Sequence, residues 1–271
     1  MPFTPSHAVI ALPFVRTRLV PGAVAVGAMT PDVPLFVRAT PISYAGTHDP
    51  WWLPGTTVLA LALLVVWRIV LRPTAAELSP RWLAERLPPA WGKGAVAALR
   101  ETFPPSFGRI VLLGVSLLLG VASHILWDAF THEGRAGSNL LPGLAELWGP
   151  VPGYTWLQHG SSVLGLLILG VWALAWLRHR PAVPVTRALS SWVRVAWPVS
   201  LAVILIVAWA VGLAALGPLT DDFTVAHLAY RVLPPACAVW AGVTLALCLV
   251  IQAWRSGPTR GGERDTPGRG A

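Results

Sequence analysis

The sequence predicts an all-α membrane protein, a polytopic bundle of transmembrane helices, and three observations support this fold class. Of 271 residues, 55% are hydrophobic and only 12% carry a charge, about half of the roughly 25% that is usual in soluble domains. The apolar residues are concentrated in five windows long enough to cross a hydrocarbon layer about 30 Å thick as a helix. The 26 Pro and 25 Gly residues indicate broken helices and irregular connections.

The N-terminal region predicts a broken helical hairpin. Residues 7–14 and 19–29 are apolar, but Arg16 and Arg18 separate them. Pro13 and Pro21 interrupt them, and Pro31 and Pro34 follow closely. A secretory signal peptide should begin with basic residues, whereas this chain begins Met-Pro-Phe-Thr-Pro. We therefore expect two short helices packed against the bundle, and the alternative is a sixth crossing through this region.

Five membrane spans are predicted after the hairpin. No charged residue lies near the centre of any of them, and the second carries an acidic residue, Asp128, toward its end. Together with the hairpin they form one predicted membrane-embedded domain, residues 1–255, followed by a Gly/Arg-rich tail, 256–271, that we expect to be disordered. The predicted spans are 54–71, 109–130, 160–177, 195–216 and 232–253.

The arginines in the connections predict the orientation, because cytoplasmic loops carry an excess of Lys and Arg. The connections after the first and third spans and the tail are basic, whereas those after the second and fourth carry Glu133, Glu146, Asp221 and Asp222. We expect the basic side, including the C-terminus, to be cytoplasmic. The net charge of +8 then faces anionic lipids, so the expected partners are membrane lipids, with no nucleic acid.

Two further features of the spans have structural interpretations. Tryptophans cluster at span ends, as in an aromatic belt. Gly114 and Gly120 in the second span predict close packing against another helix.

The second span carries His124, Asp128 and His132 at spacing i, i+4, i+8. An ionisable side chain in a span costs about 2.5–3.5 kcal/mol and usually faces the protein interior, and on a helix these three share nearly one face. Imidazole and carboxylate are ligands for zinc and similar metals. The alternative is that Asp128 forms a cap or salt bridge and the histidines are interfacial. His132 is the weakest member, because Gly134 predicts that the helix frays there.

Other candidates fall at the same predicted end of the bundle. His48 precedes the first span, and Gln158 and His159 precede the third. His7 and Asp32 bracket the hairpin, whose two ends must lie close together. Each of these residues alone has a simple explanation as a loop, turn or helix residue, but their shared side predicts a joint site.

Four segments resemble a bacterial integral membrane family catalogued as domain of unknown function 4184, and the resemblance covers residues 1–254. The segments are Met-Pro-Phe-Thr-Pro-Ser-His7-Ala, Gly-Ala-Met-Thr-Pro-Asp32, Ser-His124-Ile-Leu-Trp-Asp128-Ala-Phe-Thr-His132 and Trp-Leu-Gln158-His159-Gly-Ser-Ser. That family is similar to predicted membrane-bound metal-dependent hydrolases, which in turn are distantly similar to the helical, zinc-dependent phospholipase C and nuclease fold.

The motifs of those hydrolases are an N-terminal Thr-His, a Pro-Asp, a Thr-His-Ser and a Ser-His-x-x-x-Asp. Ser6 replaces the Thr of the first motif, and Asp49 replaces the Ser of the third. The resemblance implies metal ligands at His7, Asp32, His48, His124 and Asp128.

These observations predict a metal-dependent hydrolase in the bacterial cell membrane. It would hold one or two divalent metals, with zinc expected, and His132 and His159 would be further ligands or catalytic proton carriers. The expected substrate is a phosphate ester or a lipid-linked molecule near the outer interface. The alternative is a non-enzymatic polytopic protein, a transporter or an assembly factor, in which the polar stripe is structural.

Overall fold

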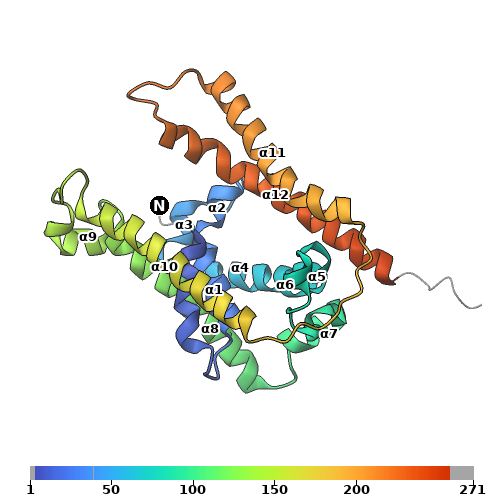
Figure 1. Ribbon diagram of the computed structural model, residues 1–271. Coiled ribbons are helices and arrows are strands. Elements are labelled where there is room, and N and C mark those ends of the chain that lie inside the picture. Colours follow the sequence, from blue (N-terminus) through green and yellow to red (C-terminus); the bar gives the residue numbers. More distant parts are fainter. Residues whose placement is uncertain (1–3, 39, 257–271) are drawn as a thin grey trace, which may run out of the picture.

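The structure, a computed structural model, describes residues 4–38 and 40–256. This part of the chain is an all-α helical bundle without a β-strand (Figure 1), which confirms the predicted fold class. The tail that we predict to be disordered lies outside the described residues from position 257 onward.

Five helical segments are long and apolar enough to cross a membrane, which confirms the five predicted spans. The spans are longer than their hydropathy windows, because polar residues at their ends continue the helix. The third, for example, begins at Gly153, seven residues before the predicted start. The segments are Pro50–Leu78, Phe107–Thr131, Gly153–Arg178, Ser191–Leu216 and Val225–Arg255.

The first span is one continuous run of short helical elements, and the other four are single helices. The run consists of η3 (Pro50–Trp52), α4 (Leu53–Val66), η4 (Trp67–Leu71), η5 (Arg72–Thr74) and α5 (Ala75–Leu78). The single helices are α8 (Phe107–Thr131), α10 (Gly153–Arg178), α11 (Ser191–Leu216) and α12 (Val225–Ser256). The short connecting elements are η2 (Thr30–Asp32), α2 (Val33–Phe36), α3 (Tyr44–Thr47), α6 (Arg81–Ala84), η6 (Pro89–Lys93), α7 (Ala95–Thr102), α9 (Ala136–Leu140) and η7 (Pro142–Leu144).

The N-terminal hairpin consists of η1 (Thr4–Phe14) and α1 (Pro21–Met29). Neither arm is a candidate span, so the prediction of two short helices packed on the bundle is confirmed. The first arm is a 3₁₀ helix, unusually long for that type. Pro21 begins α1, a position where the missing N–H costs nothing. The hairpin packs against α8 and α10.

The hairpin approaches α8 closely because both helices carry glycine at the crossing. A Cβ at Gly120 would lie 2.7 Å from the backbone nitrogen of Ala28, and a Cβ at Gly27 would lie 3.2 Å from the Cα of Gly120. The predicted close packing is therefore confirmed at Gly120. It is wrong at Gly114, where a Cβ would meet no atom within 4 Å, because that residue faces away from α1. Beside the crossing lies a buried core of Ala23, Ala60, Leu64, Leu113, Leu117 and Val121.

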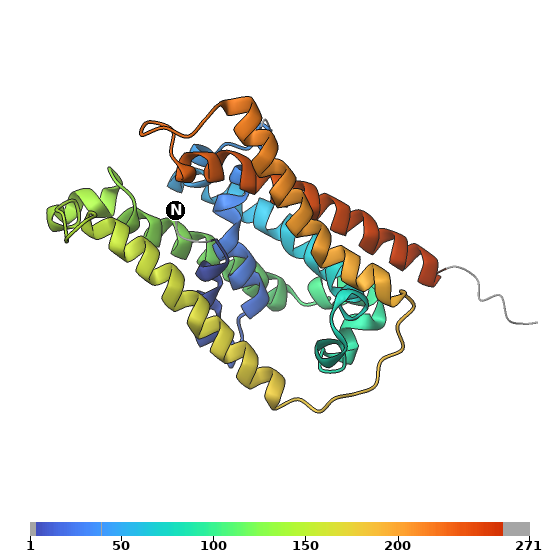
Figure 2. The same ribbon diagram turned by 45° about the horizontal axis from the view of Figure 1, so that its top comes forward.

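Helices α11 and α12 form an antiparallel pair that lies side by side in both views (Figures 1 and 2). Trp197 stacks on Trp240 at 4.9 Å between ring centroids, and its indole N–H donates to Thr244 at 2.9 Å. The Gln252 amide near the end of α12 donates to the carbonyl of Val70 at 2.9 Å. That contact attaches the pair to the first span.

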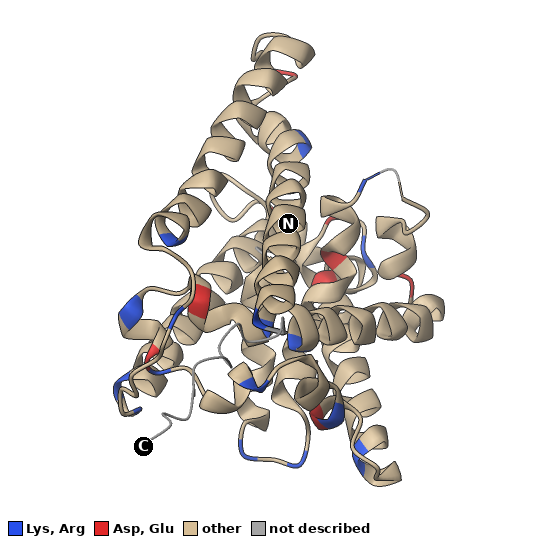
Figure 3. Cartoon of the chain, turned by 90° about the vertical axis from the view of Figure 1, so that its right-hand side faces the viewer, with Lys and Arg blue, Asp and Glu red and all other residues tan. Residues whose placement is uncertain are grey.

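The two basic connections meet Arg255, near the end of α12, at the end of the bundle opposite the hairpin's ends. Glu77, fully buried, accepts hydrogen bonds from the backbone N–H groups of Ala188 and Leu189 and from Arg255. Most Lys and Arg residues lie toward one end of the bundle (Figure 3). The grouping of the basic segments is as the sequence predicts, and their cytoplasmic location remains a prediction.

Candidate metal centre

Asp32, His48, His124 and Asp128 form a buried group at the other end of the bundle. Their exposed fractions are between 0% and 3%, and one ligand atom from each lies within 4.8 Å of the others. Asp32 ends η2, His48 follows α3, and the other two lie one turn apart on α8. Segments almost 100 residues apart in the sequence thus bring together four groups that could hold a metal ion.

Short hydrogen bonds fix the two members that come from loops. The Thr4 hydroxyl donates to Asp32 Oδ2 at 2.7 Å, which joins the two ends of the hairpin. The Thr47 hydroxyl donates to the carbonyl of Pro31, also at 2.7 Å. Thr47 therefore links the adjacent His48 to Pro31, the residue that precedes Asp32. The predicted approach of the hairpin's ends is confirmed.

The two histidines have defined tautomers. His48 Nδ1 lies 2.9 Å from the carbonyl oxygen of Tyr44, and His124 Nδ1 lies 2.7 Å from that of Ala28. A carbonyl oxygen only accepts, so each Nδ1 carries the hydrogen and each Nε2 of the neutral ring keeps a lone pair. The two Nε2 atoms lie 3.2 Å apart. In two neutral rings these lone pairs repel each other, and a proton or a metal cation between them removes the repulsion.

The carboxylates complete the set of acceptors. Asp128 Oδ2 lies 3.5 Å from both Nε2 atoms, and Asp32 Oδ1 lies 3.7 Å from that of His124 and 3.9 Å from that of His48. Asp32 Oδ1 and both oxygens of Asp128 are buried without a hydrogen-bond partner among the described residues. In a tetrahedral zinc site with ligands at about 2.0–2.2 Å, neighbouring ligand atoms are about 3.3–3.6 Å apart. The four residues could therefore hold a metal ion.

His7 approaches the other carboxylate oxygen of Asp128, Oδ1, rather than the Oδ2 that lies near His48 and His124. Its Nε2 is 3.8 Å from Asp128 Oδ1 and has no hydrogen-bond partner among the described residues. Its ring lies 4.0 Å from that of His124 between centroids. Burial and the neighbouring His124 lower the pKa of His7 to about 3, so the ring is neutral at physiological pH. The structure brings His7 beside the group, and its role as a ligand remains a prediction.

His132 lies just beyond the end of α8, as the glycine after it predicts: the helix ends at Thr131, and Gly134 has a positive φ of 68°. Its Nδ1 donates to the backbone oxygen of Asp128 at 3.2 Å and lies 3.6 Å from the carboxylate. The Gln158 amide donates to its Nε2 at 3.1 Å. That hydrogen bond occupies the lone pair on Nε2 of His132. Burial also lowers the pKa of His132. A neutral His132 therefore presents an N–H to Asp128 rather than a metal-binding lone pair.

His159 does not join the other candidates. It is exposed, whereas the preceding Gln158 is only 8% exposed and contacts His132. Adjacent helix residues point about 100° apart, so α10 can direct only one of the two toward the site. The catalytic role of His159 remains a prediction without a contact to support it.

Four groups that position the ligands are missing from the sequence-based prediction. They are the hydroxyls of Thr4 and Thr47 and the backbone carbonyls of Ala28 and Tyr44. Only the two threonines, each in a segment that precedes a candidate histidine, left a signal, because backbone carbonyls leave no trace in a sequence.

The fold and the buried Asp/His group together define a multi-pass membrane protein with a candidate metal centre. The chain belongs to the family described as "Domain of unknown function (DUF4184)", which matches residues 1–254. No curated protein and no solved structure matches the chain. The resemblance to this family is therefore confirmed, while the resemblance to metal-dependent hydrolases and the bacterial origin remain predictions.

Proposed function

We propose that this protein is a membrane-embedded, metal-dependent hydrolase of a phosphate ester or another lipid-linked substrate. The observation that carries the proposal is that the Nε2 atoms of His48 and His124 face each other at 3.2 Å beside the carboxylates of Asp32 and Asp128. Buried acceptors without protons are costly unless a cation satisfies them. Two imidazoles and two carboxylates are a donor set that suits zinc.

The geometry around Asp128 supports one or two cations. Oδ2 faces His48 and His124, whereas Oδ1 faces His7. Asp32, His48, His124 and Asp128 would hold one cation, and His7 would help to hold a second if one binds. A bound divalent metal polarises a phosphoryl group and lowers the pKa of water from about 15.7 to about 7.

The side chains around the ligands have separate parts in the proposal. Thr4 holds Asp32 through a hydrogen bond of 2.7 Å. His132 donates toward Asp128, is held by Gln158 and can pass on a proton. These residues keep the ligands oriented before the substrate arrives, as supporting hydrogen bonds do in metal sites.

The position of the site favours a substrate from the lipid interface. Asp128 lies three residues before the end of the second span, at Thr131, a rise of about 4.5 Å at roughly 1.5 Å per residue. A phosphate ester in the headgroup layer is therefore at the depth of the proposed ligands.

The test combines metal content with hydrolysis. We expect detergent-purified protein to retain one or two zinc equivalents per chain by mass spectrometry and to hydrolyse bis(p-nitrophenyl) phosphate, in which water adds to phosphorus and p-nitrophenolate leaves. Asp128→Asn and His48→Ala should lose the bound metal, and their rate of hydrolysis should fall at least about 100-fold. The controls are Asp221→Asn and His179→Ala, which are exposed and lie outside the group.

Two outcomes contradict the proposal. Stoichiometric zinc without hydrolysis of phosphodiesters or phospholipids shows a structural metal, a role for which four protein ligands also suffice. Protein that binds no metal after exposure to zinc favours the non-enzymatic alternative.

A further inference from the structure

A cavity of about 430 Å³ lies between η1, α8 and α10 beside the candidate metal centre. His7 connects the two: it lines the cavity, and its Nε2 lies 3.8 Å from Asp128 Oδ1. On α8, Ser123 and Trp127 line the cavity and directly precede His124 and Asp128. The cavity is therefore lined by the side of α8 next to the face that carries His124 and Asp128.

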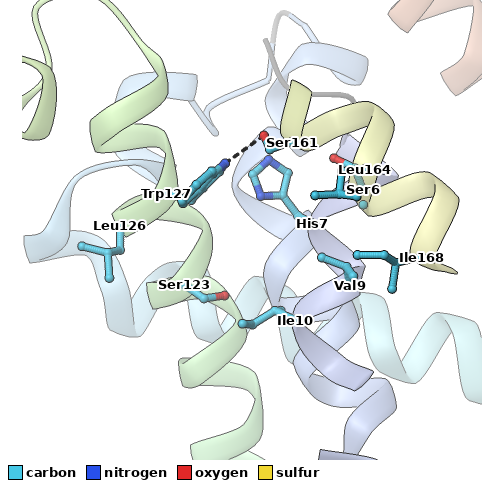
Figure 4. A pocket seen from close by; sticks show the side chains of 11 residues that line it. Ser6, His7, Val9, Ile10, Ser123, Leu126, Trp127, Ser161, Leu164 and Ile168 are labelled. Carbon is cyan, nitrogen blue, oxygen red and sulfur yellow. Dashed lines mark hydrogen bonds between the residues drawn. The ribbon is translucent and has the colours of Figure 1, made fainter. Parts of the chain in front are cut away.

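The walls of the cavity are mostly apolar, and several face outward. Val9 and Ile10 follow His7 along η1, and Leu164 and Ile168 line the opposite side from α10 (Figure 4). Leu164 is 59% exposed and Ile168 is 43% exposed. Both lie on a candidate membrane span, where the medium that meets an exposed apolar side chain is lipid hydrocarbon. The cavity thus opens sideways into the membrane rather than toward water.

The lining residues of α8 and α10 extend the cavity from the ligands toward the middle of the bilayer. Ser123 lies eight residues before the end of α8 at Thr131, a rise of about 12 Å. Ile168 lies fifteen residues after the start of α10 at Gly153, a rise of about 22 Å. The cavity therefore spans depths below the headgroup layer, whereas the ligands lie nearer the ends of the helices.

One hydrogen bond closes the wall between the two spans near the ligands. The indole N–H of Trp127 donates to the Ser161 hydroxyl at 3.1 Å and joins α8 to α10 (Figure 4). A molecule that reaches His7 from the membrane would pass beneath this bond, along Ile168 and Ser123.

We propose that this cavity binds a hydrocarbon chain of a membrane lipid and so places the lipid's phosphate ester at the metal centre. The identity of the reacting group rests on the proposed hydrolase function. Binding of the chain follows from the cavity's apolar walls, its opening to hydrocarbon and its contact with His7. Because the two parts can fail separately, the test measures chain binding and metal content independently.

The experiment uses the full chain in phosphatidylcholine nanodiscs that contain phosphatidylglycerol with a diazirine at the end of one acyl chain. After illumination, mass spectrometry should find the crosslinks concentrated on cavity residues of α8 and α10. Ser123→Phe fills the cavity and should reduce this labelling about tenfold, the effect of excluding two methylenes. The control is Leu118→Phe on the same helix, where residue 118 is 43% exposed and does not line the cavity.

A second pair of variants keeps the test valid if Ser123→Phe disturbs its neighbour His124. Ile168→Trp should reduce labelling, whereas Leu167→Trp, at a position that is 60% exposed and outside the cavity lining, should not. If each variant is labelled as strongly as its control, the proposal is wrong. That holds even if the protein binds zinc and is active. Specific labelling in protein without metal or hydrolysis supports the chain site and contradicts only the hydrolase.

Discussion

The Nε2 atoms of His48 and His124 lie 3.2 Å apart, and each Nδ1 donates to a backbone carbonyl, so in the neutral rings both Nε2 atoms carry a lone pair. This arrangement is unfavourable between neutral rings alone and favourable around a cation. It predicts that zinc stabilises the fold. At a zinc concentration about 100 times the Kd, the gain is about 2.7 kcal/mol.

Thermal unfolding in detergent checks this prediction. The unfolding midpoint of wild-type protein should rise when zinc replaces a chelator, and that of His48→Ala should not. A rise of equal size in both proteins would contradict the assignment, because it would show that zinc binds elsewhere.

The crossing of α1 and α8 predicts a large effect of one added methyl group. Gly120→Ala would place a Cβ 2.7 Å from the nitrogen of Ala28, whose carbonyl orients His124. We expect a lower unfolding midpoint and about 10- to 100-fold weaker zinc binding. Gly114→Ala on the same helix meets no neighbour and should be neutral or stabilising by up to about 1 kcal/mol. Isothermal titration with zinc measures the affinities, and similar losses in both variants would count against the positioning role of the crossing.

The pair formed by Gln158 and His132 predicts a loss of rate without a loss of metal. Gln158→Leu removes the amide that holds the His132 ring, while the four proposed ligands stay in place. We expect zinc content to be unchanged and kcat to fall by about 10- to 100-fold. His159→Ala, next to it on the exposed side of α10, should leave both unchanged. If His159→Ala lowers kcat more than Gln158→Leu does, the exposed histidine is the catalytic one.

A pH dependence of stability follows from the opposite end of the bundle. Arg72, which is buried, donates two hydrogen bonds to Glu101 and holds the pKa of that carboxyl below its usual value. A depressed folded-state pKa contributes stability above the unfolded pKa, about 4.3 for Glu, and loses it as the pH falls further. Because Glu101 is about half exposed, the contribution is about 1 kcal/mol or less.

The corresponding measurement compares wild type with Glu101→Gln across pH. The difference in unfolding midpoint should be present at pH 7 and shrink below about pH 4.3. Glu85→Gln is the control, because Glu85 pairs with the largely exposed Arg81. A difference that grows toward low pH would contradict the ion-pair explanation.

The predicted orientation is tested by single cysteines in a background without Cys237 and Cys248. Glu146→Cys lies in the connection between α8 and α10, at the end with the metal centre. Trp82→Cys lies among the basic connections and is 57% exposed in wild type. A membrane-impermeant maleimide should label residue 146 in intact cells and residue 82 only after lysis. The reverse pattern would place the site on the cytoplasmic side.

The spans and the ligand stripe on α8 could be predicted because they depend on local patterns. Hydropathy identifies a span, and the spacing of His124 and Asp128 places them on one helix face. The joint site could also be predicted from topology, because the ends of a hairpin must meet. Exact helix starts could not, since polar residues such as Gln158 extend a helix beyond its apolar window. For that reason the sequence could not show which of Gln158 and His159 points toward the site.

X-ray absorption spectroscopy of the zinc-loaded protein is the most direct test of the central claim, that four buried side chains meet around one cation. The account predicts nitrogen and oxygen ligands at about 2.0–2.2 Å, with the outer-shell scattering of two imidazoles, and loss of one imidazole in His124→Ala. Sulfur ligands, or a shell of water oxygens that is unchanged in His124→Ala, would contradict it.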